Sequence, residues 1–273
     1  MPDESAGLDR LSLNQITTEK RTLEETVEAC ARAGIQWLGA WRHKIQPDPN
    51  RAARIIRDAG MQVSSLCRGG FFPAATPEER RRRIDDNRCA IDEAATLGTD
   101  LLVLVCGPAP NRDLASARGM VVDGIAEIES YAHDCGVRLG IEPLHPMYAA
   151  ERSVIVTLEQ ANLIASQFAA ERVGVVVDVF HVWWDPKVYE GIAQAGPRIL
   201  GFHVSDWIVP LPDILMGRGM MGKGAIELRR LRAAVELAGF RGPIEIEIFN
   251  DKVWSTPLEA LLQEIRQSFA ESV

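Results

Sequence analysis

Eight short apolar segments alternate with eight segments of helical character along the chain, and this alternation limits the fold more than any other feature of the sequence. The apolar segments predict strands at residues 11–15, 35–41, 61–67, 101–106, 138–142, 173–178, 199–203 and 243–249. The segments between them predict helices at residues 22–33, 49–59, 76–97, 113–135, 157–170, 186–195 and 226–238, with a last helix opening at Thr256.

Regular alternation of strands and helices predicts parallel βαβ units, and eight such units in 273 residues predict an α/β fold of the closed (β/α)8 TIM-barrel type. We expect one domain over residues 1–273, with residues 1–9 as a loosely ordered polar lead, because no linker or break in composition divides the chain. A doubly wound open sheet is the competing architecture. It calls for a Gly-x-Gly-x-x-Gly loop after an early strand, which Gly69-Gly70 does not supply.

The charge balance and the N-terminal sequence bear on partners and location. A formal net charge of -8 disfavours binding to nucleic acid or to anionic lipid. The first nine residues lack the basic-then-apolar pattern of a signal peptide, and no apolar run approaches the ~20 residues that span a bilayer. The five cysteines form no Cys-x-x-Cys pair, which indicates reduced thiols. We therefore expect a cytoplasmic protein with neither a nucleic acid nor a membrane as its partner.

Four predicted strands in the second half of the chain end in side chains that bind metals, namely Glu142, Asp178, His203 and Glu247. In a TIM barrel the functional site lies at the carboxyl ends of the strands, so we expect these four groups to converge. Four ionisable groups at one level would repel one another or be desolvated at a heavy cost unless a cation organises them. Three carboxylates and one imidazole suit one divalent ion, with Mn²⁺ as the first choice and Mg²⁺, Co²⁺ or Zn²⁺ as alternatives. The competing interpretation is that each group is a solvated residue at a strand end.

The last strand offers two glutamates. Glu245 and Glu247 point to the same side, because alternate side chains of a strand share a face. Glu247 is nearer the carboxyl end, so we take Glu247 as the ligand and place Glu245 deeper in the barrel.

Further residues just past strand ends are candidates for substrate binding. His181 follows Asp178 by three residues, where a neutral imidazole can bond a sugar oxygen, take a second metal or be satisfied by backbone. His145 has a similar position after the preceding strand. Arg218 lies in a glycine-rich segment, where it can clamp hydroxyl groups or a phosphate. The ends of the first three strands contribute Asn14, Trp41, Arg42 and Arg68, and an aromatic residue there either lines a sugar pocket or packs a loop.

The sequence resembles the xylose-isomerase-like TIM barrels, the sugar phosphate isomerase/epimerase group, over nearly its whole length. The resemblance rests on Ile141-Glu142-Pro143, Val177-Asp178-Val179-Phe180-His181, Phe202-His203-Val204-Ser205-Asp206, Arg218 with Gly222-Lys223-Gly224, and Glu245-Ile246-Glu247. It implies that Glu142, Asp178, His203 and Glu247 hold one divalent metal, that the two glutamates of this set move the proton, and that His181 and Arg218 touch the substrate.

The implied chemistry is isomerisation or epimerisation of a keto-sugar or keto-polyol. A metal chelated by the carbonyl and an adjacent hydroxyl stabilises the enediolate that forms when the neighbouring proton is lost. We hypothesise that Glu142 and Glu247 flank opposite faces of this plane, so that one removes the proton and the other returns it. A dehydratase of a keto-inositol or related keto-polyol would use the same enediolate and expel a hydroxyl group, and the sequence does not separate the two reactions.

Two alternatives come from other functional classes. An abasic-site endonuclease of this fold needs a three-metal cluster and a basic DNA-facing surface, against which stand the net charge of -8 and only five histidines. A barrel that binds a polyol or a partner without catalysis is the second. The resemblance also leaves assembly into a homo-oligomer open, because barrels of this family often pair.

Overall fold

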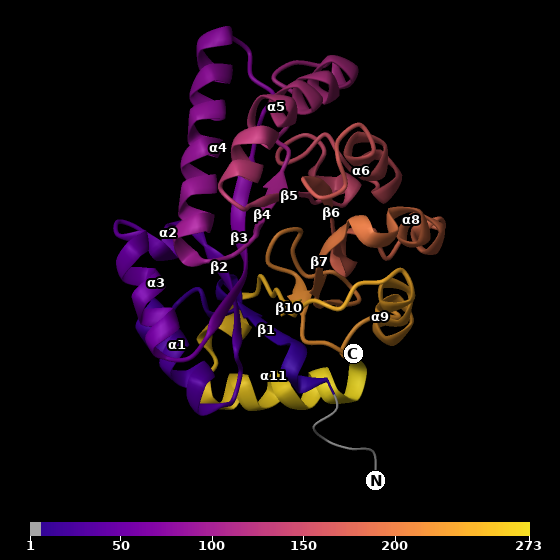
Figure 1. The fold of residues 1–273 in the computed structure, drawn as a ribbon. Helices are drawn as coiled ribbons and strands as arrows, with labels where there is room; N and C mark the ends of the chain where they lie inside the picture. The colour runs from indigo at the N-terminus through magenta and orange to yellow at the C-terminus, as the bar shows by residue number, and fades with distance from the viewer. Residues whose placement is uncertain (1–6) are drawn as a thin grey trace.

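A barrel of eight parallel strands forms the centre of the molecule, and helices surround it (Figure 1). The computed structural model describes residues 7–273. Neighbouring strands follow the order β1-β10-β7-β6-β5-β4-β3-β2 and close the barrel. The strands are β1 (Leu11–Asn14), β2 (Trp37–Trp41), β3 (Gln62–Gly70), β4 (Leu101–Val105), β5 (Arg138–Ile141), β6 (Val173–Asp178), β7 (Ile199–Val204) and β10 (Ile244–Ile246). The predicted (β/α)8 barrel is confirmed.

Eight longer helices alternate with these strands, namely α1 (Leu23–Arg32), α3 (Pro49–Asp58), α4 (Pro77–Leu97), α5 (Leu114–Asp134), α6 (Leu158–Ala165), α8 (Val188–Ala195), α9 (Leu228–Leu237) and α11 (Leu258–Ser272). Short helices α2 (Arg42–Ile45), α7 (Val179–Val182) and α10 (Asp251–Ser255) follow strand ends, and β8 (Asp206–Trp207) pairs with β9 (Arg218–Gly219). A capping box opens α1, because the side chains of Thr22 and Glu25 each accept a hydrogen bond from the other residue's backbone N–H.

Several predicted elements differ from the structure. The helix predicted at 157–170 ends at Ala165, because the guanidinium of Arg198 bonds the carbonyl of Ala165 and the chain continues in tight turns. The strand predicted at 243–249 ends at Ile246, although the N–H of Glu247 still donates to Val204. Between β7 and α9, where the sequence predicts no element, the chain forms the antiparallel β8–β9 pair.

The predicted loose lead at residues 1–9 lies largely outside the described residues. Its described end forms a short 3-10 helix, Leu8–Arg10, which the Arg10 guanidinium ties to the Gly242 carbonyl at 2.9 Å. Whether the whole chain forms one domain stays a prediction.

Two apolar layers position the site. The larger one lies between the strands and the surrounding helices. A smaller cluster fills the barrel interior with Ile16, Trp41, Cys67, Leu101, Val103, Val176, Leu200 and Phe249. A Cβ on Gly140 would come within 2.8 Å of Leu101 and Val176, so this glycine makes room for them. The packed interior holds the polar residues above it at the carboxyl ends of the strands. Within residues 7–273, no helix is both long enough and apolar enough to cross a membrane.

Candidate metal centre

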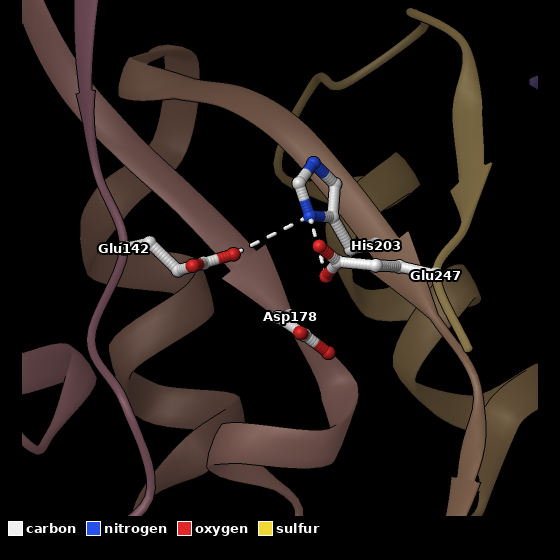
Figure 2. A group of neighbouring side chains, drawn as sticks. All are labelled: Glu142, Asp178, His203 and Glu247. Atoms are coloured by element: carbon white, nitrogen blue, oxygen red, sulfur yellow. Dashed lines mark ion pairs between the residues drawn. The ribbon is translucent and has the colours of Figure 1, made fainter. Parts of the chain in front are cut away.

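Glu142, Asp178, His203 and Glu247 converge at the carboxyl ends of the barrel strands (Figure 2). Asp178 ends β6 and is paired in register with His203 on β7, while Glu142 and Glu247 directly follow β5 and β10. Each residue offers one ligand atom, and these atoms all lie within 4.8 Å of one another. All four side chains are buried. The expected convergence is therefore present, and the role of the four residues as metal ligands stays a prediction.

The contacts inside this cluster leave polar atoms unsatisfied. Nδ1 of His203 lies 3.3 Å from Oε1 of Glu142 and 3.4 Å from Oε2 of Glu247. Among residues 7–273, neither this nitrogen nor Oε1 of Glu142 finds a hydrogen bond, although both are buried. Buried polar atoms are costly without a partner. A cation between these atoms would satisfy them, and a donor set of three carboxylates and one imidazole fits a divalent ion.

The two glutamates of the cluster have opposite pKa shifts. Burial raises the pKa of Glu142 to about 7, against the influence of the neighbouring His203. Burial also acts to raise the pKa of Glu247, but the charge of Arg218 and the contact with His203 outweigh it and lower this pKa to about 2. At neutral pH Glu247 is ionised while Glu142 exchanges a proton readily. Paired groups whose pKa values are driven apart are typical of acid–base sites.

His203 is enclosed by acids on both sides of its ring. Burial acts to lower its pKa, but the charge of Glu245 and the contacts with Glu142 and Glu247 raise it well above the ordinary value. Without a cation, the imidazole therefore carries the positive charge that the surrounding carboxylates attract.

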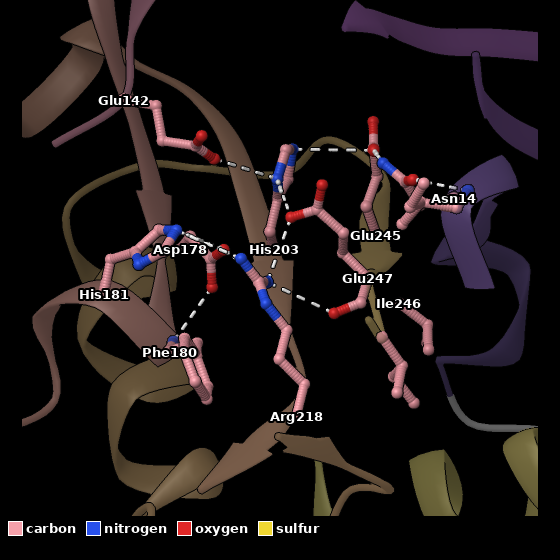
Figure 3. A network of polar contacts seen from close by, with 12 residues as sticks. Asn14, Glu142, Asp178, Phe180, His181, His203, Arg218, Glu245, Ile246 and Glu247 are labelled. Atoms are coloured by element: carbon pink, nitrogen blue, oxygen red, sulfur yellow. Dashed lines mark hydrogen bonds and ion pairs between the residues drawn. The ribbon is translucent and has the colours of Figure 1, made fainter. Parts of the chain in front are cut away.

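Glu245 lies one layer below the cluster and faces the far edge of the His203 ring (Figure 3). Its Oε2 is 3.5 Å from Nε2 of His203. Asn14 donates to Oε2 of Glu245 at 2.9 Å, and Ser64 donates to Oε1 at 2.7 Å. A Cβ on Gly39 would come within 2.2 Å of Oε2 of Glu245, so only glycine leaves room there. The position of Glu245 beneath Glu247 agrees with the sequence analysis.

Arg218 extends across the cluster from β9 (Figure 3). Its Nη1 donates to Oδ2 of Asp178 at 2.7 Å and to Oε2 of Glu247 at 3.1 Å, and its Nη2 is 3.0 Å from Nε2 of His181. Burial holds the pKa of His181 well below its usual value, so this imidazole is neutral. The structure thus brings together His181 and Arg218, which were both predicted to contact the substrate. Arg218 also pairs directly with Asp178 and Glu247, two of the candidate metal ligands.

A small cavity lies beside the cluster, with a volume of about 20 Å³. Trp41, His181 and Arg218 line it, together with residues that the sequence analysis missed, among them Tyr148, Leu215 and Phe249. The hydroxyl of Tyr148 donates to the carbonyl of Ile214, which fixes the segment between β8 and β9 at the cavity. The volume admits about one water molecule, so a substrate needs more space than this structure leaves at the cavity.

Two other predicted substrate residues lie away from this cavity. The amide of Asn14 bonds Glu245, and its carbonyl oxygen accepts from Nε1 of Trp41 at 2.7 Å. The ring of His145 packs between Trp184 and Trp207. Periodicity could have identified Phe249, because it follows Glu247 by two residues and so shares its face. Leu215 carries no comparable signal.

Comparisons with known proteins identify relatives over most of the chain. Residues 27–271 match the family described as xylose isomerase-like TIM barrel. The 3-dehydroshikimate dehydratase of Pseudomonas aeruginosa is 27% identical over 250 residues, which cover 88% of this chain and 38% of that protein. The chain therefore spans well under half the length of this relative. The inosose isomerase of Bacillus subtilis is 27% identical over 280 residues, covering 97% of this chain and 98% of that protein.

Solved structures agree with the fold. The crystal structure of protein SMc04130 from Sinorhizobium meliloti 1021 superposes with a TM-score of 0.94 at 44% identity, covering 97% of this chain and 98% of that one. The structure of IOLI protein with a binding zinc atom superposes with a TM-score of 0.84 at 22% identity, covering 96% and 97% of the two chains. The family match over residues 27–271 confirms the resemblance drawn from the motifs: this chain belongs to the xylose isomerase-like TIM-barrel family.

Proposed function

We propose that this protein is a metal-dependent isomerase or epimerase that removes a proton next to the carbonyl of a keto-sugar or keto-polyol. The observation that carries the proposal is the convergence of Glu142, Asp178, His203 and Glu247. Within residues 7–273, buried Oε1 of Glu142 and Nδ1 of His203 in this cluster form no hydrogen bond. The relatives named inosose isomerase support the same reaction class.

Glu142, Asp178, His203 and Glu247 would hold the cation, for which we would test Mn²⁺ first and Mg²⁺, Co²⁺ and Zn²⁺ beside it. A divalent ion at this place supplies electrophilic stabilisation of the negative charge that develops on the substrate oxygens when the proton leaves. The surrounding side chains would bind the substrate and move the proton.

Glu142 and Glu247 are the groups that would move the proton. They reach Nδ1 of His203 from different strands, because β5 and β10 are separated by two strands in the barrel (Figure 2). We assign removal of the proton to Glu142, because its pKa before a cation binds, about 7, is the higher of the two. The second glutamate would return a proton to the far face or to the neighbouring carbon. In the reverse direction the roles exchange.

Arg218, the neutral His181 and the indole of Trp41 line the cavity and would contact the substrate. Arg218 is held by Asp178 and Glu247, so it also offsets part of the negative charge of the cluster. Asn14 and His145 do not line the cavity, so they would contact the substrate only if the side chains around the cavity rearranged.

A dehydratase is the second candidate, since elimination of a hydroxyl group can follow the same proton removal. The 3-dehydroshikimate dehydratases of Pseudomonas aeruginosa and Pseudomonas putida, at 27% and 26% identity, support it.

Solvent-deuterium exchange into a panel of ketoses and keto-polyols with added Mn²⁺ tests the proposal. Exchange into the carbon next to the carbonyl, lost in Glu142→Gln and Glu247→Gln, is the expected result, and loss of water from the substrate would identify the dehydratase. Protein that binds no divalent ion and exchanges no proton would refute both. The cytoplasmic location, the absence of nucleic-acid and membrane partners, and assembly into a homo-oligomer stay predictions.

A further inference from the structure

Two arginines beside the cavity, Arg68 and Arg152, differ in their hydrogen-bond and ion-pair partners from the other buried or partly buried arginines among residues 7–273. Every other arginine among residues 7–273 that is partly or wholly buried forms an ion pair with a carboxylate or a hydrogen bond with a backbone carbonyl. Arg42, for example, pairs with Asp86 and Glu93. Within the same described residues, the guanidinium groups of Arg68 and Arg152 contact neither kind of oxygen, although both residues are partly buried.

Both arginines lie at the edge of the candidate site. Arg152 lines the cavity, and Arg68 directly follows Cys67, which also lines it. Aromatic rings support the two side chains in place of acids. The Cζ atom of Arg68 lies 4.0 Å from the ring centroid of Phe71, and that of Arg152 lies 5.8 Å from the ring centroid of Tyr148. The rings hold the guanidinium groups by stacking and cation–π contact and leave their N–H donors free.

The two charges are close enough to influence each other. Burial lowers the pKa of Arg68, and the charge of Arg152 lowers it further. Like charges held together in a partly buried place are unfavourable unless an anion lies between them. The carboxylates of the candidate metal centre have other partners, because Asp178 and Glu247 are bonded to Arg218 and Glu142 faces Nδ1 of His203.

We propose that Arg68 and Arg152 bind an oxyanion group of the substrate, a carboxylate or a phosphate. Two guanidinium groups offer paired N–H donors that match the geometry of either anion. The substrate would then be an acidic keto-polyol rather than a neutral sugar, with its charged group at the arginines and its carbonyl end at the metal cluster. This inference rests on the proposed function, because it takes the cavity beside the cluster as the substrate site.

Calorimetric titration of the Mn²⁺-loaded protein tests the proposal with three ligands. 3-Dehydroshikimate carries a carboxylate, D-fructose 6-phosphate carries a phosphate, and 2-keto-myo-inositol is neutral. We expect one of the two anions to bind at least about tenfold more tightly than the neutral ligand. Arg68→Gln and Arg152→Gln should each weaken that anion about tenfold or more and leave the neutral ligand unchanged. Arg68→Lys, which keeps the charge but loses the paired donors, should be intermediate.

Arg54→Gln is the matched control, since Arg54 is an exposed arginine on α3. It should bind all three ligands as the wild-type protein does. The proposal is overturned if neither anion binds the wild-type protein more tightly than the neutral ligand, or if the Arg68 and Arg152 variants keep wild-type anion affinity. A separate titration with Mn²⁺ alone tells this failure apart from failure of the proposed function. The arginine variants should keep wild-type Mn²⁺ affinity, whereas wild-type protein that binds no Mn²⁺ refutes the metal-dependent function itself.

Discussion

Replacing Glu245 with glutamine should weaken binding of the divalent ion, although Glu245 is not one of the four candidate ligands. With a cation at Nδ1, the His203 imidazole is neutral and its proton sits on Nε2. That nitrogen lies 3.5 Å from Oε2 of Glu245, which Asn14 and Ser64 hold in place. Glu245 therefore orients the ring and makes Nδ1 a better donor to the metal.

The expected loss of metal affinity follows from this arrangement. Loss of an outer carboxylate partner of a metal-bound histidine typically costs 10–100-fold in metal affinity, or about 1.4 to 2.8 kcal/mol. The glutamine side chain keeps the volume that Gly39 leaves open and can still accept hydrogen bonds, so Glu245→Gln removes mainly the charge. We expect a loss in this range, measured by competition with a fluorescent Mn²⁺ chelator.

A matched control separates this effect from a general change of charge. Glu264→Gln makes the same chemical change at an exposed position of α11 and should leave Mn²⁺ affinity unchanged. Thermal melting of both variants shows whether the fold is retained. If Glu245→Gln folds and binds Mn²⁺ as tightly as the wild-type protein, the outer-partner role of Glu245 is wrong.

Three further predictions concern the same site. Glu142→Gln and Glu247→Gln should each slow solvent-deuterium exchange by about 10²- to 10⁴-fold, measured by NMR of the recovered substrate, and full exchange in either variant would contradict the two-glutamate scheme. Mn²⁺ affinity should rise with pH from 5.5 to 8, because the ion must displace the proton of His203, whose pKa is raised well above its ordinary value, and below about pH 7 also the proton of Glu142. The dependence should therefore be steeper below pH 7, and a flat calorimetric profile over this range would argue against the scheme. Tyr148→Phe should remove the bond to Ile214, worth about 1 kcal/mol, and speed amide hydrogen exchange of residues 208–217, whereas unchanged exchange would show that other contacts keep the segment closed.

Local signals in the sequence were sufficient to predict the barrel and the convergence of the candidate ligands. Apolar runs and helix caps such as Thr22 with Glu25 depend on neighbours a few residues away, and they can be read without the fold. Parallel strands in a closed barrel bring their carboxyl ends to one face, so a polar residue at each of several strand ends is expected to converge. For this reason Glu142, Asp178 and His203 could be placed together from their positions alone.

The tertiary structure decided which groups each side chain contacts. Asn14 lies at a strand end, as predicted, but its amide bonds Glu245, which is 231 residues away in the sequence. The closing of the cavity by Leu215 and the pairing of Arg218 with two carboxylates likewise join distant segments. The tertiary structure also decided that Arg42 pairs with two carboxylates, whereas Arg68 has no acid partner within residues 7–273. These features depend on side-chain direction and on packing between distant segments, whereas strand and helix patterns depend on the local spacing of residues.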